Sequence, residues 1–90
     1  MKTLHLHIYG RVPGVWVRES IRQEAEQLGI TGWVKNCAEG SVVGDIAGDE
    51  AAVSAMLDWC HTGPPKARVE KVEQTATVGS FIGFITRSSE

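Results

Sequence analysis

Residues 10–18 contain the types of group that can bind an anion. They read Gly-Arg-Val-Pro-Gly-Val-Trp-Val-Arg and lie between an alternating apolar run and a segment with helical spacing. Glycine lets a backbone curl around a ligand, and a helix N-terminus presents unpaired N–H groups at the positive end of its dipole. Arg18 adds a planar guanidinium that matches phosphate or carboxylate oxygens. By spacing alone the stretch fits either an anion site or a purely structural turn, and it matches neither common nucleotide-binding glycine motif.

Hydrophobic spacing predicts the elements that hold this stretch in place. Apolar residues alternate along the predicted strands and recur at three- and four-residue intervals along the predicted helices. Gly29 is placed to end the first helix, and prolines after Gly63 stop the second. Val69 and Val72 break strict alternation, which indicates a bulge. The predicted elements are strands at 4–9, 31–37 and 41–47, helices over 17–28 and around 53–60, a strand within 67–78 and a strand-like segment at 81–87.

This order is β-α-β-β-α-β, with the last strand whole or divided in two. The simplest arrangement is an α+β fold of the ferredoxin-like kind, a sandwich in which one antiparallel sheet has two helices packed on one face. A chain of 90 residues can build one modest core but not two. Residues 1–90 are therefore predicted to form a single domain.

Composition limits the partners of this chain. The formal net charge is −2, so neither nucleic acid nor an anionic membrane is expected as a partner. No apolar run approaches the ~20 residues of a membrane span, and the N-terminus lacks the pattern of a signal peptide. Cys37 and Cys60 are too few for a disulfide scaffold, which predicts reduced thiols and a cytoplasmic location. A small domain with one core is expected to be a monomer.

Two other functions fit parts of the predicted sheet less well. RNA-recognition domains share the element order but carry aromatic residues on their central strands, whereas residues 41–47 have none and include an aspartate that repels phosphate. His5 and His7, two residues apart on one strand face, suit chelation of Zn or Cu with Cys37 as a candidate third ligand. Histidines that face solvent on the open side of the sheet are the expected case, and no metal site is predicted.

The stretch at 10–18 resembles the signature loop of acylphosphatases, which reads G-R-V-Q-G-V-x-F-R in that family. The similarity continues through Leu-Gly-Ile-Thr-Gly-Trp-Val-Lys-Asn at 28–36, Gly-Ser-Val at 40–42 and Gly-Pro-Pro-Lys-Ala-Arg-Val at 63–69. It ends in Phe-Ile-Gly-Phe-Ile-Thr-Arg at 81–87 and so covers nearly the whole chain. The resemblance implies the ferredoxin-like fold and hydrolysis of the carboxyl–phosphate bond of acyl phosphates to a carboxylate and phosphate, without metal or cofactor.

The resemblance also implies roles for individual residues. Carried over by position, the family's phosphate-binding arginine falls on Arg18 and its water-orienting asparagine on Asn36. The ligand to expect is an acyl phosphate or inorganic phosphate. The backbone cradle for the phosphate falls on Pro13, Gly14, Val15, Trp16 and Val17.

This set of residues suits the implied reaction. A carboxylate leaving group, whose conjugate acid has a pKa of about 4, departs without a general acid. Phosphoryl transfer mainly requires a positioned nucleophile and stabilisation of charge on the equatorial oxygens. One arginine with backbone N–H groups meets the second need, and one amide that holds water meets the first. The same groups are inadequate for phosphate monoesters, because an alkoxide is a far poorer leaving group.

Three loop positions depart from the family pattern. Pro13 stands in place of glutamine and removes a backbone N–H. That loss weakens phosphate binding if the N–H faces the anion, and only fixes the backbone if it does not. Trp16 occupies the variable position, and Val17 replaces phenylalanine, which leaves volume beneath the loop. The alternative function is a non-catalytic anion-binding or interaction domain on the same scaffold, with activity weakened by these three residues.

Overall fold

The computed structural model describes the backbone of residues 1–11, 14–63 and 67–87, with the side chains of those residues except 11 and 14–16. The elements follow the predicted order, with the last strand divided in two. They are β1 (Lys2–Arg11), α1 (Gly14–Gln27), β2 (Thr31–Asn36), β3 (Val42–Gly48), α2 (Glu50–Thr62), β4 (Arg68–Ala76) and β5 (Phe84–Thr86).

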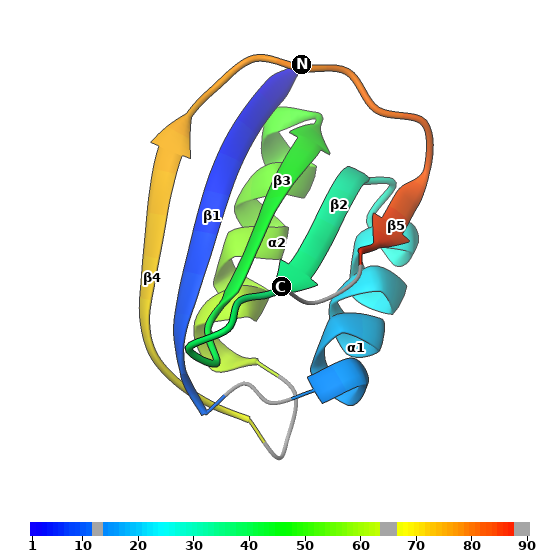
Figure 1. Ribbon diagram of the computed structural model, residues 1–90. Helices are drawn as coiled ribbons and strands as arrows, with labels where there is room; N and C mark the ends of the chain where they lie inside the picture. Colours follow the sequence, from blue (N-terminus) through cyan, green and yellow to red (C-terminus); the bar gives the residue numbers. More distant parts are fainter. Residues whose placement is uncertain (12–13, 64–66, 88–90) are drawn as a thin grey trace.

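The strands form one sheet in the order β4-β1-β3-β2-β5, and both helices cover the same face (Figure 1). This is the predicted ferredoxin-like α+β arrangement. β1 pairs antiparallel with β3 and β4, and β2 pairs antiparallel with β3. β5 lies parallel to β2, so the expectation of a wholly antiparallel sheet is wrong at this edge. The chain leaves β4 at one end of the sheet, crosses to the far edge and turns back, which gives β5 the direction of β2 (Figure 1).

The core lies between the sheet and the two helices. Alternation along β1 turns Leu4, Leu6 and Ile8 toward the helices, where each side chain is buried. The apolar stripes of the helices meet them there, because a stripe of this spacing can exclude water only against another apolar face. This packing fixes the rotation of α1 about its own axis. The buried helix residues are Val17, Ile21 and Ala25 of α1 and Val53, Met56 and Cys60 of α2.

β4 carries the predicted bulge. Its register with β1 steps from the pair Tyr9–Lys71 to the pair Gly10–Val69, which leaves Glu70 as an extra residue. As a result Val69 and Val72, three residues apart, both pack against the core. The break in alternation along the sequence marks this bulge, because an extra residue shifts the side-chain faces by one position.

Gly32 is a position where a side chain does not fit. Its φ is +145°, and an added Cβ would lie 1.9 Å from the backbone oxygen of Asp45 on the neighbouring strand. We expect Gly32→Ala to lower the free energy of unfolding by ~3 kcal/mol, because β2 and β3 must move apart to make room for the methyl group. Gly29→Ala is the control, with φ of +72° and no atom within 4 Å of the added Cβ. At Gly29 the strained backbone alone should lower the free energy of unfolding by ~1 kcal/mol. Urea unfolding measures both variants, and an equal loss of unfolding free energy in the two would contradict the steric explanation.

The buried thiol of Cys60 makes the folded protein less stable at alkaline pH. Burial raises the pKa of its thiol from 9.0 to about 12. Between these values the unfolded chain releases the thiol proton and the folded chain retains it, so stability present below pH 9 is lost as the pH rises. Relative to Cys60→Ala, the native protein should lose about 1.4 kcal/mol between pH 8 and pH 10. Urea unfolding of both proteins at pH 8 and pH 10 measures this loss. A difference in unfolding free energy between the two proteins that is the same at both pH values would contradict the prediction.

Candidate active site

Arg18 is held at the edge of the helix layer with part of its guanidinium occupied. Its neighbour Val17 and Ile21, one turn on, are buried in the core, which fixes the direction in which the Arg18 side chain leaves the helix. Its Nη1 donates a hydrogen bond to the backbone oxygen of Arg87, just after β5. Its Nε is buried and has no hydrogen-bond partner. One side of the guanidinium is therefore anchored while a buried donor stays unused.

Asn36 ends β2, on the face of the sheet that the helices cover. Val34, two residues earlier and so on the same face, is buried in the core. Beyond Asn36 the chain turns in a tight hairpin, in which Cys37 N donates to Ser41 O at 2.8 Å and Gly40 N donates to Cys37 O at 3.0 Å. The Asn36 Oδ1 is buried and accepts no hydrogen bond. The hairpin thus fixes the backbone that carries an unused acceptor.

Arg87 connects the two residues. Its backbone N donates to Val34 O at 2.8 Å, and its backbone oxygen accepts from Arg18. Its own guanidinium lies over the Trp33 ring, 4.4 Å from the centroid, which holds this segment against β2. Arg18 is therefore tied to β2 two residues before Asn36. The end of β2 and the start of α1 lie at the same end of the molecule (Figure 1).

The orphaned atoms distinguish this place from the rest of the described chain. Within residues 1–11, 14–63 and 67–87, the buried side-chain polar atoms without a hydrogen-bond partner are Arg18 Nε and Asn36 Oδ1. Leaving such a group unpaired costs about 1–3 kcal/mol, and more when the group is charged. An unpaired buried donor on Arg18 and an unpaired buried acceptor on Asn36 suit a ligand that carries oxygen atoms and a water molecule.

Neighbouring carboxylates on α1 are neutralised by another arginine. Arg22 Nε donates to both oxygens of Glu19, at 2.8 and 3.0 Å, and Arg22 Nη1 lies 2.8 Å from Glu26 Oε2. The hydrogen bond from Arg22 holds the pKa of Glu19 below its usual range, so this side chain is charged and already paired. Arg22 in this way offsets the negative charge that lies next to Arg18 in the chain.

The expected cradle is helical over most of its length. α1 begins at Gly14 rather than at Val17, so residues 14–17 form its first turn, and the loop is shorter than predicted. The N–H groups of a first turn have no intrahelical acceptor, which keeps them available to an anion. Pro13 lies outside the described residues, as do the side chains of Val15 and Trp16.

Val17 has the spare volume that its replacement of phenylalanine predicts. The side chain is buried, and it lines a cavity of about 10 Å³ together with Ile8, Ile21 and Trp59. This volume is close to the minimum that one water molecule needs. The space beside the Val17 side chain is therefore too small to hold more than one water molecule.

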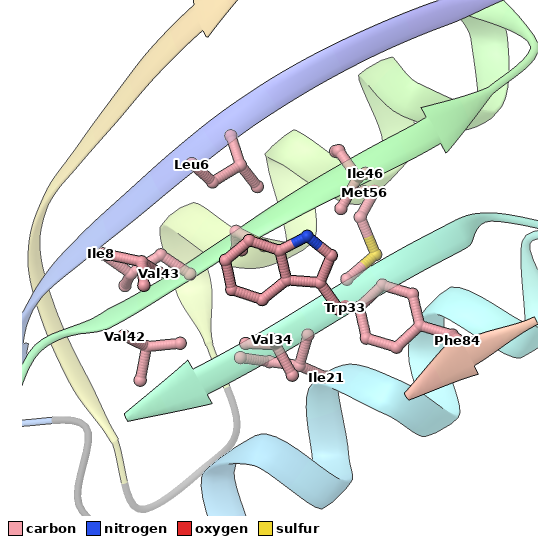
Figure 2. Close-up of a pocket in the computed structure, with 12 residues that line it drawn as sticks. Leu6, Ile8, Ile21, Trp33, Val34, Val42, Val43, Ile46, Met56 and Phe84 are labelled. Carbon is pink, nitrogen blue, oxygen red and sulfur yellow. The ribbon is translucent and has the colours of Figure 1, made fainter. Parts of the chain in front are cut away.

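Other hollows in the structure are poor places for a phosphate. Figure 2 shows an apolar cavity of about 10 Å³ in the core, lined by side chains that include Leu6, Met56 and Phe84. It is too small and offers no donors. A groove of about 550 Å³ is lined by residues that include Lys2 and Glu50. Lys2 begins β1 whereas α1 follows the end of β1, so this groove lies at the opposite end of the sheet from Arg18.

Comparison with known proteins identifies the family. The family model for acylphosphatases matches residues 4–84. An acylphosphatase of Thiobacillus denitrificans is 53% identical over 88 residues, which cover 98% of this chain and 99% of that protein. The chain belongs to the acylphosphatase family.

Solved structures of acylphosphatases have the same fold as this family member. The structure of an acylphosphatase from Coxiella burnetii superimposes with a TM-score of 0.91 at 36% identity, covering 96% of this chain and 92% of that one. The acylphosphatase from Bacillus subtilis gives a TM-score of 0.91 at 27% identity, covering 97% of this chain and 99% of that one. Neither of the helices described in this family member is long and apolar enough to cross a membrane.

The histidines of β1 lie on the open face, as predicted, but each has a partner. His5 Nδ1 lies 2.7 Å from Asp45 Oδ1. His7 does not share a site with His5 and instead lies close to Cys37 and Glu39. Cys37 was a candidate third ligand from the sequence, whereas Glu39 was not. The only signal for Glu39 was its place in the short connector after Cys37, where a hairpin folds back over the sheet.

Proposed function

We propose that Arg18 and Asn36 form the catalytic pair of an acyl phosphate hydrolase, with Arg18 binding the phosphoryl group and Asn36 orienting the attacking water. Membership of the acylphosphatase family supports the reaction, which converts an acyl phosphate into a carboxylate and phosphate. The observation that carries the residue assignment is the pair of buried atoms without partners, Arg18 Nε and Asn36 Oδ1.

Arg18 and the first turn of α1 bind the phosphoryl oxygens. The Nε–H of Arg18 donates to one oxygen, while the bond from Nη1 to the Arg87 carbonyl keeps the guanidinium from turning away. The N–H groups of residues 14–17 donate to the others, and the helix dipole adds favourable potential. These donors stabilise the charge that spreads over the equatorial oxygens in the transition state.

Asn36 places the nucleophile. Its buried Oδ1 accepts a hydrogen bond from one water proton, which leaves a water lone pair directed at phosphorus. Because the hairpin fixes the Asn36 backbone, the water is held without loss of entropy in the reaction step. The carboxylate leaves on the opposite side of phosphorus and needs no proton, because its conjugate acid has a pKa of about 4. The protons of the attacking water remain on the oxygens of the phosphate product. The proposed chemistry therefore requires neither a metal ion nor a cofactor.

Release of phosphate from acetyl phosphate by the purified protein tests this function. We expect turnover that is undiminished by a chelator, and a rate on a phosphate monoester such as glycerol phosphate that is at least ~10³-fold lower, because no acid protonates an alkoxide. The rival function is a non-catalytic anion-binding or interaction domain. Saturable phosphate binding without turnover would favour the rival and contradict the proposal.

We place the protein in the cytoplasm as a monomeric single domain over residues 1–90, with no nucleic acid or membrane partner. The free thiols of Cys37 and Cys60 and the net charge of −2 support this placement. Light scattering at micromolar concentration should give a molar mass close to 9.8 kDa, and twice that value would contradict a monomer.

A further inference from the structure

Three metal-ligating side chains converge on the sheet face that the helices leave open. They are His7 of β1 with Cys37 and Glu39 of the turn between β2 and β3, and their ligand atoms all lie within 4.8 Å of one another. We propose that His7 Nε2, the Cys37 thiolate and the Glu39 carboxylate bind a divalent transition metal ion, Zn²⁺ in the first instance. Nitrogen, sulfur and oxygen from three protein ligands are a donor set that Zn²⁺ accepts, with a water in the fourth position. The proposal does not rest on the proposed function.

The histidine is oriented as a metal ligand would be. Tyr9 donates its hydroxyl proton to Glu73 Oε1 at 3.0 Å, so its oxygen is left to accept from His7 Nδ1 at 3.1 Å. The two rings stack with their centroids 4.1 Å apart. Lys71 lies 3.1 Å from Glu73 and holds the pKa of that carboxyl below its usual range, which keeps it an acceptor. A carboxylate that reaches the far nitrogen of a histidine is the common support for a metal-bound imidazole.

The hydrogen bonds around His7 leave its Nε2 open to a metal ion. This atom lies 2.7 Å from Ser41 Oγ, and Ser41 gives its own hydroxyl proton to Glu39. Tyr9 and Ser41 therefore both present an oxygen to the same imidazole. A neutral imidazole carries one N–H and can serve only one of them. A metal ion bound to Nε2 and shared with Cys37 and Glu39 completes the network and relieves Ser41 of the contact.

The cluster needs only a small closure around the ion. Tetrahedral Zn²⁺ with bonds of ~2.0–2.3 Å holds its ligand atoms ~3.3–3.8 Å apart. His7 Nε2 and Glu39 Oε1 are already 3.9 Å apart. The Glu39 side chain is 66% exposed and can reach the ion by giving up its hydrogen bond from Ser41, whereas that of His7 is 27% exposed and held on both sides. The Glu39 carboxylate accepts a hydrogen bond from the Ser41 hydroxyl, which lies between it and His7 Nε2.

Protection of one thiol gives a direct test. Cys60 is buried, so alkylation of the native protein followed by mass spectrometry reports Cys37 alone. Zn²⁺ at stoichiometric concentration should slow alkylation of Cys37 at least tenfold, and a chelator should restore the rate. Co²⁺ in place of Zn²⁺ should give one thiolate charge-transfer band per chain, and this band should vanish in Cys37→Ser.

Variants separate a built site from a lone cysteine that binds metal. His7→Gln and Glu39→Gln should each weaken Zn²⁺ binding at least tenfold, and Tyr9→Phe about tenfold through loss of support to His7. His5→Gln, on the same strand face and paired with Asp45, is the matched control and should change binding less than twofold. Thermal unfolding of each variant without metal checks that it is folded. Absence of protection and of the cobalt band, or equal binding by His7→Gln, Glu39→Gln and the native protein, would overturn the proposal.

Discussion

Replacing Arg18 with alanine is expected to lower kcat/KM for acyl phosphate hydrolysis by about 10³-fold. Loss of one preorganised donor to a developing oxyanion lowers turnover by ~10²–10³-fold, and loss of an arginine that serves a transferring phosphoryl group lowers it by ~10³–10⁵-fold. Inorganic phosphate should also inhibit far more weakly, since Arg18 Nε would contact the phosphoryl group before and during transfer. The measurement is initial-rate kinetics on acetyl phosphate, with phosphate as the inhibitor.

Two further variants show whether the effect belongs to the guanidinium. Arg22→Ala removes an arginine one turn along the same helix, where its partners are Glu19 and Glu26. It should change kcat/KM only a few-fold. Arg18→Lys keeps the charge but loses the planar fork, so its activity should lie between that of the native protein and that of Arg18→Ala. Loss of the bond to the Arg87 carbonyl should lower the free energy of unfolding by about 1 kcal/mol, too little to account for the kinetic loss.

Replacing Asn36 with alanine is expected to lower kcat by ~10²–10³-fold while phosphate inhibition changes less than threefold. The physical reason is that Asn36 would hold the water rather than the phosphoryl group, so its loss affects the reaction step more than binding. Initial-rate kinetics with the same inhibitor separate the two effects.

Asn36→Asp and Thr31→Val sharpen the comparison. Aspartate keeps the oxygen acceptor but adds a negative charge beside the phosphate, so both kcat and phosphate affinity should fall. Thr31 lies on the same strand, and its hydroxyl donates only a long bond to Ala47 O at 3.5 Å, so Thr31→Val should leave kinetics within twofold. Turnover by Asn36→Ala at the native rate would remove Asn36 from the mechanism, whatever the result at Arg18.

Local patterns in the sequence predict most of the fold. The stripe of Val17, Ile21 and Ala25 predicts the buried face of α1, and all three side chains are buried. The irregular spacing of Val69 and Val72 predicts the bulge in β4, where the register skips one residue. These features depend on side chains close together along the chain, which is why periodicity detects them.

Features that depend on distant parts of the chain escaped prediction. The parallel pairing of β5 with β2 follows from the path of the chain across the end of the sheet, which no local pattern encodes. One local feature was also missed. α1 starts at Gly14, whereas its apolar stripe begins only at Val17. The contact of Glu39 with His7 joins the turn between β2 and β3 to a residue inside β1, and their spacing in sequence carries no trace of it.

The sequence and the structure point to the same two side chains of the candidate site, but by different kinds of observation. Residue type and position singled out Arg18, and resemblance to the family added Asn36, whereas the structure marks both by their unpaired buried atoms. The role of Arg87 could not be predicted, because it acts through its backbone, and backbone contacts leave no mark on residue type. Catalytic roles for Arg18 and Asn36 and the cradle at residues 13–17 stay predictions.

A crystal structure with phosphate or sulfate bound tests the central claim most directly. We expect one anion that accepts a hydrogen bond from Arg18 Nε and from N–H groups of residues 14–17, with a water on Asn36 Oδ1 facing the phosphorus or sulfur atom. Nη1 of Arg18 should keep its bond to the Arg87 carbonyl. An anion bound elsewhere while Arg18 Nε and Asn36 Oδ1 stay unpaired would contradict the account.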